Sequence, residues 1–366
     1  MAQINKPSDY FNTVTWTGDI TDRTISGVGF QPDWIWWKQR NGTDDHRLID
    51  SVRGEGTTSY KILFSDTTDA EYDGNDNGGS QGNINAITSD GFSGVQGTVG
   101  WNNWNGSGLN YVGWNWLASN STASNTDGSI ASTVSVNTTS GFSIVSWTGT
   151  GSGSTIGHGL GVKPKIIFVK NRSNTGNWVV NVGEIIGTDE RSLYLNSIDT
   201  IKNDAQATNG YTYNNTTTTF STASGSSGNQ NDVNQSGSAM IAYCFAEKKG
   251  FSKFGKYIGN GSGTDGTFVY TGFKPALVVV RSYTTASSWN FMDNKRQTYN
   301  DGTIPYLKAN LNEVEVTSNP NMDFLSNGFK FRTTDNDFNG SGQSYIFMAF
   351  AENPLVGTNN IPTTAR

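Results

Sequence analysis

Side chains able to do acid–base or nucleophilic chemistry are few in this sequence of 366 residues. It holds two histidines, His46 and His158, and a single cysteine, Cys244. Catalysis needs several such groups gathered at one place. We interpret both histidines as loop or turn residues, and Cys244, which lies in an apolar run, as a small buried hydrophobe. The sequence therefore predicts a protein that is not an enzyme.

Two loops rich in Asp and Asn match the first half of a calcium-binding loop. Alternating oxygen ligands along a tight turn could hold a hard cation. The candidate metal ligands are Asp73, Asn75, Asn77, Asp335, Asp337 and Asn339. The twelfth position, where a bidentate glutamate belongs, is Ile84 in one loop and Ile346 in the other. Calcium is the one cofactor that the sequence allows, and ordinary Asx-rich turns are the competing interpretation.

Aromatic and amide side chains that could bind a carbohydrate gather near residue 100. Aromatic faces suit sugar rings, and amides supply hydrogen bonds to hydroxyl groups. The candidate ligand residues are Trp101, Trp104, Asn102, Asn103, Trp36 and Arg40. Trp101 and Trp104 lie in a Gly/Asn-rich loop, so we expect them to be exposed. Trp114 and Trp116 alternate within an expected strand, which favours a place in the core instead.

The elements that would position these residues follow one pattern repeated three times. A strand opened by proline begins near residues 32, 164 and 275, and a turn before an aromatic-rich strand closes each copy near residues 116, 246 and 350. Copies of more than 100 residues are whole domains rather than solenoid repeats. We predict an all-β fold of three tandem β-sandwich modules, with jelly-roll or concanavalin-like topology.

The predicted boundaries follow from these landmarks and from the composition between them. We expect an N-terminal arm at 1–12, modules at 13–119, 140–249 and 250–354, a polar linker or exposed strand arm at 120–139, and a C-terminal tail at 355–366. Continuous apolar runs in the second and third proline-opened strands predict central strands buried on both faces.

Composition limits the classes of partner. Aromatic residues make up 12% of the chain, which indicates a folded protein rather than a disordered one. The net charge of −6 offers no overall basic surface, so we expect no nucleic acid and no membrane as partner. The N-terminus lacks a basic region followed by an apolar stretch, which predicts synthesis in the cytosol and export only by another route, such as release in an assembled particle.

Short motifs along the chain resemble those of virion proteins from marine tailed phages, including phages of cyanobacteria and Pelagibacter. The motifs are Lys6-Pro7-Ser8-Asp9-Tyr10-Phe11-Asn12-Thr13, Gly29-Phe30-Gln31-Pro32-Asp33, Asp50-Ser51-Val52-Arg53-Gly54, Ser89-Asp90-Gly91-Phe92, Asn105-Gly106-Ser107-Gly108 and Phe347-Met348-Ala349-Phe350-Ala351-Glu352-Asn353-Pro354. The resemblance spans essentially the whole chain. It implies a structural or fibre-like protein on the particle surface and attaches no catalytic residues to these motifs. We expect Asp50 and Arg53 to hold a loop by a charge-assisted hydrogen bond.

Three functional hypotheses remain open at this point. The first is a capsid decoration or other head-surface protein, whose partners are other phage virion proteins and copies of itself in the particle. The second is a tail fibre or receptor-binding adhesin that recognises host-surface glycans. The third is an enzyme such as a polysaccharide depolymerase, which would need two acids converging in a groove.

Overall fold

The structure is a computed structural model that describes residues 3–74, 82–97, 104–187, 191–203, 211–222, 228–297, 299–300, 302–318, 320–357 and 361–364. The predicted all-β class is confirmed, because antiparallel sheets account for nearly all regular structure in these residues. The helices described are one 3₁₀ turn, η1 (Pro7–Asp9), and two short α-helices, α1 (Gly183–Ile186) and α2 (Gly228–Asn234).

Unit 1 is a sandwich of a five-stranded and a three-stranded sheet. The five-stranded sheet has the order β1-β8-β3-β4-β5, with β1 (Phe11–Thr17), β3 (Trp34–Gln39), β4 (Arg47–Asp50), β5 (Leu63–Phe64) and β8 (Asn110–Trp116). The smaller sheet has the order β2-β7-β6, with β2 (Arg23–Ile25), β6 (Ile84–Thr88) and β7 (Gly91–Gly94).

Unit 3 repeats this strand order. Its five-stranded sheet runs β20-β27-β22-β23-β24, with β20 (Ser252–Ile258), β22 (Phe273–Ser282), β23 (Asn290–Asp293), β24 (Tyr306–Lys308) and β27 (Ser344–Pro354). Its smaller sheet runs β21-β26-β25, with β21 (Phe268–Tyr270), β25 (Met322–Leu325) and β26 (Gly328–Phe331).

Unit 2 has the same arrangement with strands added at both edges. Its large sheet runs β16-β15-β14-β13-β19-β11-β10-β9, with β9 (Ala123–Asn125), β10 (Ser132–Asn137), β11 (Phe142–Thr148), β13 (Ile166–Asn171), β14 (Val179–Asn181), β15 (Arg191–Tyr194), β16 (Lys202–Asn203) and β19 (Ala239–Phe245). The small sheet runs β12-β18-β17, with β12 (Ser154–Gly157), β17 (Thr212–Tyr213) and β18 (Thr219–Thr222). The segment expected as a polar linker or strand arm thus supplies β9 and β10.

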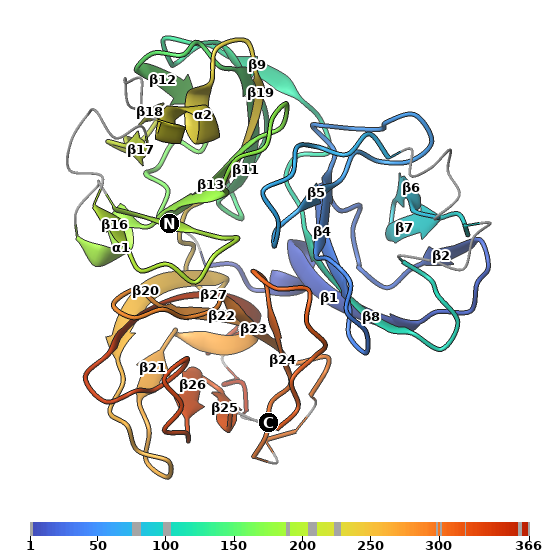
Figure 1. The fold of residues 1–366 in the computed structure, drawn as a ribbon. Coiled ribbons are helices and arrows are strands. Elements are labelled where there is room, and N and C mark those ends of the chain that lie inside the picture. The colour runs from blue at the N-terminus through green and yellow to red at the C-terminus, as the bar shows by residue number, and fades with distance from the viewer. Residues whose placement is uncertain are drawn as a thin grey trace.

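The three units lie around a common centre, as Figure 1 shows, with unit 1 in blue, unit 2 in green to yellow and unit 3 in orange to red. Each unit turns its large sheet toward the centre and its small sheet outward. Residues 3–9 do not extend away from the body, because the Ile4 amide donates to the Lys249 carbonyl (3.0 Å) and the Ile4 side chain is buried.

Strand periodicity explains how one sheet serves two cores. In β3, Trp34 and Trp36 face the central cluster, whereas Ile35 and Trp37 face the interior of the unit 1 sandwich. Successive side chains of a strand point to opposite faces, so a strand covered on both sides is apolar throughout. All residues of β13 and β22 are buried, which confirms the expected two-sided burial of these strands.

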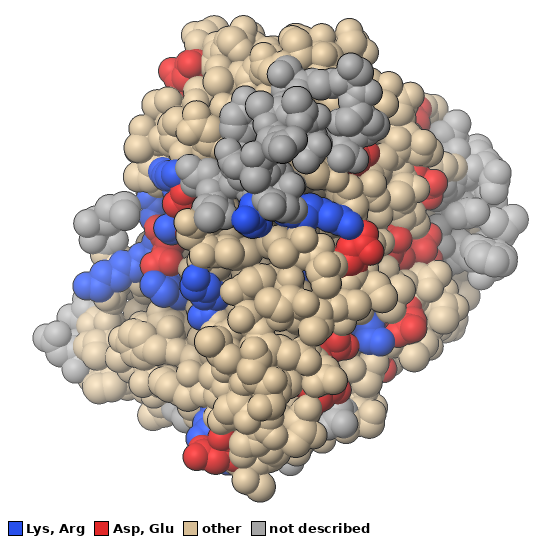
Figure 2. All heavy atoms as spheres, turned by 60° about the vertical axis from the view of Figure 1, so that its left-hand side comes forward, with Lys and Arg blue, Asp and Glu red and all other residues tan. Residues whose placement is uncertain are grey.

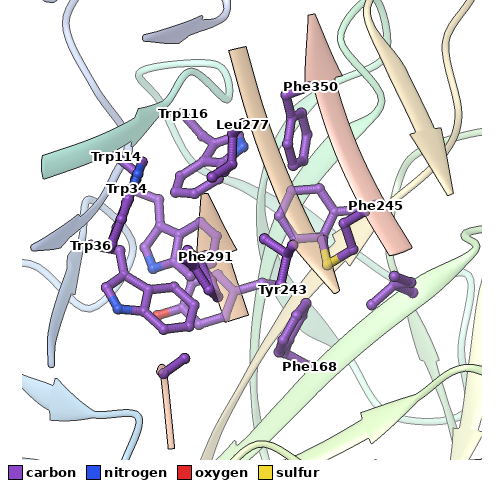
Figure 3. Packing of buried hydrophobic residues seen from close by; sticks show 14 of the residues in the cluster. Trp34, Trp36, Trp114, Trp116, Phe168, Tyr243, Phe245, Leu277, Phe291 and Phe350 are labelled. Carbon is purple, nitrogen blue, oxygen red and sulfur yellow. The ribbon is translucent and has the colours of Figure 1, made fainter. Parts of the chain in front are cut away.

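Aromatic rings from all three units meet in the central cluster (Figure 3). The Trp34 ring stacks on Tyr243 of unit 2 with centroids 4.3 Å apart, and Trp36 contacts Phe291 of unit 3 at 4.8 Å. Burying such a side chain stabilises a fold by about 2–3 kcal/mol. A large share of the apolar burial is therefore shared between units rather than contained within one sandwich.

Candidate functional site

The predicted pair Asp50 and Arg53 lies at the end of β4, fully buried where unit 1 meets unit 2. The Asp50 Oδ1 atom accepts the backbone amides of Val52 (3.0 Å) and Arg53 (2.8 Å), and its Oδ2 atom accepts the Arg53 Nε hydrogen. Tyr243 of unit 2 donates its hydroxyl to the same Oδ2 atom at 2.6 Å. The Asp50–Arg53 pair therefore closes the loop, and Asp50 also binds Tyr243 of the neighbouring unit.

The cluster continues through Glu71 into unit 2. Arg53 donates Nη1 to Glu71 Oε2 at 3.1 Å and Nη2 to the Leu48 carbonyl at 2.8 Å. Arg172 of unit 2 donates from Nε and Nη2 to the two Glu71 carboxylate oxygens, each at 2.8 Å. This planar two-point contact is the strong form of an arginine–carboxylate pair.

Unit 3 and unit 1 are joined by the same arrangement. Asp293 accepts the backbone amide of Arg296 (2.9 Å) and its Nε hydrogen (2.6 Å), and Arg296 Nη1 donates to Glu315 Oε1 at 2.8 Å. Arg40 of unit 1 contacts both Glu315 oxygens, and the Trp114 indole donates to Asp293 Oδ2 at 3.0 Å. Arg40, expected as a ligand residue, instead joins two units.

The junction of unit 2 with unit 3 carries apolar residues at the corresponding positions. Strand register and the shared inter-unit backbone bonds place Val182, Ile185, Ile201, Tyr283 and Met348 there. The Ile201 backbone amide donates to the Tyr283 carbonyl at 3.2 Å. At the charged junctions, the backbone amides of Glu71 and Glu315 donate in the same way to the carbonyls of Arg172 and Arg40, both at 2.7 Å. All five side chains belong to the central apolar cluster or pack against it.

In both charged clusters, opposite charges counteract the effect of burial on the pKa of a buried group. Burial pushes the pKa of Asp293 up, but the Arg296 charge and the hydrogen bonds outweigh it, and that pKa lies below the ordinary value. Burial likewise lowers the pKa of Arg53, yet Asp50 raises it above its ordinary value. Every carboxylate here is paired with a guanidinium. Each buried carboxylate therefore has its charge balanced at a junction between two units.

A buried cation in units 2 and 3 reaches the backbone of the preceding unit. Lys170 Nζ donates to the Thr68 carbonyl of unit 1 at 2.9 Å, and Arg281 Nη1 donates to the Ser197 carbonyl of unit 2 at 2.7 Å. Burial lowers the pKa of Lys170 to about 8. These hydrogen bonds from charged donors hold neighbouring units in place relative to each other.

His46 also lies at a junction rather than in a cleft. The Trp36 indole donates to His46 Nδ1 at 3.0 Å, and burial, with the charges of Lys38 and Arg296, lowers the pKa of His46 well below its ordinary value. The ring is neutral at pH 7, and because Nδ1 accepts a hydrogen bond, Nε2 carries the proton.

Two of the tryptophans expected at a ligand surface are buried. Trp104 is fully buried in the unit 1 core, where its indole donates to the Val95 carbonyl at 2.8 Å, so the expectation that it is exposed is wrong. Trp36, also a candidate ligand residue, is buried in the central cluster and offers no surface to a ligand. The glycines and asparagines of the loop predicted exposure, and the sequence did not show that distant residues such as Trp16 pack around Trp104. Trp101, Asn102 and Asn103 lie outside the described residues.

The second candidate calcium loop is closed by hydrogen bonds of its own. The Asn339 amide nitrogen donates to the Thr333 carbonyl (2.9 Å) and to Asn260 Oδ1 (3.0 Å), while its oxygen accepts the Asn260 amide. Asp335 Oδ1 accepts the amide of Asp337, as in an Asx turn. Within the described residues no group of three or more His, Cys, Asp or Glu side chains could hold a metal.

Asp73 of the first loop accepts the Thr57 hydroxyl at 2.6 Å. Asn75 and Asn77 lie outside the described residues, so calcium at the first loop stays a prediction.

Uncharged side chains form most of the face seen in Figure 2, and Lys, Arg, Asp and Glu gather mainly in a band across its middle. The helices of the described residues are all too short or too polar to cross a membrane. Glu71, Glu315 and Arg172 were missed in the sequence, because their roles depend on contacts between copies. The Asp–x–x–Arg spacing at Asp50 recurs in the sequence at Asp293, but the spacing alone does not show that both pairs lie at junctions between units.

The fold and these junctions define a three-unit, all-β body whose buried charges hold its parts together. The chain belongs to the family described as "Domain of unknown function (DUF7483)", whose model matches residues 6–354. Comparisons with curated proteins and with solved structures found no match. Because the family match runs through all three units, the family corresponds to the whole body and not to a single sandwich.

Proposed function

We propose that this protein is a non-enzymatic structural protein of a tailed-phage particle, carried on the particle surface as a capsid decoration protein. One observation carries the proposal, namely that three similar sandwiches close around one shared core within a single chain. A body with three similar faces around an axis can make three similar contacts with a partner of threefold symmetry. The resemblance of its motifs to marine phage virion proteins supports the same assignment.

The placement of the charged residues also supports a structural role. Arg40, Arg53, Arg172, Glu71 and Glu315 all lie in the clusters that join units. Charged groups used in this way stabilise a fixed arrangement of parts and are not arranged around a substrate.

Mass spectrometry of purified particles tests the proposal. Particles of the virus that encodes this chain are banded on a density gradient and the proteins quantified against the major capsid protein. We expect this chain in the particle band, at a copy number comparable to that of the capsid protein. Recovery only in the soluble lysate would contradict a virion protein, and a copy number typical of tail components would contradict a decoration protein.

A further inference from the structure

An exposed aromatic pair lies on the outer face of unit 3. Phe268 and Tyr270 point outward from β21, with relative exposures of 43% and 57%, and Val269 between them faces the sandwich core. β21 is an edge strand of the small sheet. Most large apolar side chains among the described residues are buried, so two aromatic rings on one open face require an explanation.

The other two units provide an internal comparison. Val269 pairs with Phe329 in unit 3, as Ile25 pairs with Phe92 in unit 1 and Ile156 with Phe220 in unit 2. In this register the positions of Phe268 and Tyr270 are held by Thr24 and Ser26 in unit 1, and by Thr155 and Gly157 in unit 2. The same fold forms with small side chains there, so the aromatic pair is not needed for folding.

The surroundings of the pair combine flat apolar surface with polar groups. A Cβ atom on Gly328 would lie 3.1 Å from the Phe268 ring, so that ring lies close over the glycine. Lys330 is the register partner of Phe268 and forms an ion pair with the exposed Asp265. Rings bordered by charged donors and acceptors match a sugar, whose C–H face stacks while its hydroxyls form hydrogen bonds.

The size of the patch favours a small ligand over a protein. An aromatic side chain offers about 150–250 Å², so two half-exposed rings present on the order of 200 Å². A stable protein interface needs about 800 Å² on each partner. We propose that Phe268 and Tyr270 form a carbohydrate-binding platform for one or two sugar rings. The proposal concerns a site on this chain and does not depend on where the protein sits in a particle.

A glycan array printed with neutral and acidic oligosaccharides and bacterial surface polysaccharides tests the platform. The full-length labelled protein is applied, and the best-bound glycan is then titrated in solution. We expect the double variant Phe268→Thr/Tyr270→Ser to bind that glycan at least tenfold more weakly than the wild type. These replacements copy the residues of unit 1, so the fold is expected to be retained, and its thermal midpoint is measured alongside.

Tyr299→Ser is the matched control, because Tyr299 is 73% exposed in a loop before β24 and lies outside the platform. It should bind like the wild type. Three results would overturn the proposal: no array member retained by the wild type, binding unchanged in the double variant, or equal loss in the control. None of these results bears on whether the chain is found in purified particles.

Discussion

At the residue scale, the three junctions between units are of two kinds, charged and apolar. Two junctions bury an Asp–Arg–Glu cluster, and the third has the buried Val182 and Ile185 and the partly buried Ile201 at the same positions. Removing ions from water costs free energy that pairing only partly returns, so an apolar replacement can be as stable. We infer that the charged junctions contribute specificity, because a guanidinium buried against the wrong unit would lack its carboxylate.

Breaking one cluster should be costly, whereas copying the apolar junction should not. Arg296→Met leaves the buried Asp293 and Glu315 without their shared partner, so we expect a loss of about 3–5 kcal/mol in urea unfolding. The combined variant Asp293→Val/Arg296→Ile/Glu315→Ile/Arg40→Tyr copies four of the five positions of the junction of units 2 and 3, keeps Trp114 at the fifth, and should recover part of that loss.

The partly exposed pair of Arg332 with Asp323 supplies the control for this series, since the two side chains are 45% and 13% exposed. Arg332→Met should cost less than about 1 kcal/mol. If the combined variant is less stable than Arg296→Met alone, the two kinds of junction are not interchangeable and the inference about specificity is wrong.

Asp66 should make stability depend on pH. Its Oδ1 atom accepts the His46 amide at 3.1 Å, a position held by Asn196 and Asn310 in the other units. Burial, followed by the Asp45 charge, raises the pKa of Asp66 to about 8 from an ordinary 3.8. The folded state binds this proton more tightly, so stability falls as the pH rises from about 4 to about 8.

Asp66→Asn removes this titration and copies the residue of the other units. We expect the variant to be more stable than the wild type at pH 8, by on the order of 1–3 kcal/mol, with a smaller difference at pH 5. Thermal unfolding followed between pH 5 and 9 measures both. Asp265→Asn, at an exposed carboxyl whose pKa is lowered by Lys330, should leave the slope between pH 5 and 8 unchanged.

At the element scale, the pattern of apolar residues along each strand predicted more of the structure than the overall composition did. The apolar runs of β13 and β22 indicated two buried faces, and the structure has them. The sequence did not reveal that Ser132–Asn137 would pair with β11, since polar strands carry a weak periodic signal. The sequence also predicted an exposed Trp104, because burial of a loop aromatic depends on distant contacts. One such contact is the hydrogen bond from the Trp16 indole to the Trp104 carbonyl.

A buried asparagine closes the same loop in each unit and offers a test at this scale. Asn105, Asn234 and Asn339 donate to backbone carbonyls of the loops that follow β1, β11 and β20, respectively. Asn339→Ala leaves the Thr333 carbonyl without this donor, and we expect a cost of about 1–3 kcal/mol. Equal stability of the variant and the wild type in urea would show that water replaces the amide at no cost.

At the scale of the whole molecule, the shared core should make the three units unfold together. The Phe245 ring contacts Trp34 and Phe142 and also Phe254 and Phe350 of unit 3. Phe245→Ala should cost about 3–5 kcal/mol and lower one transition without dividing it. Scanning calorimetry measures this, and separate transitions for single units would contradict a common core.

The proposed place of this body on a phage head is tested most directly by cryo-electron microscopy of the intact particle. The account predicts three-lobed density, fitting the three sandwiches around their centre, repeated over the head lattice. Density of this shape found only at the tail or its fibres would contradict decoration of the capsid and would make host recognition the leading function.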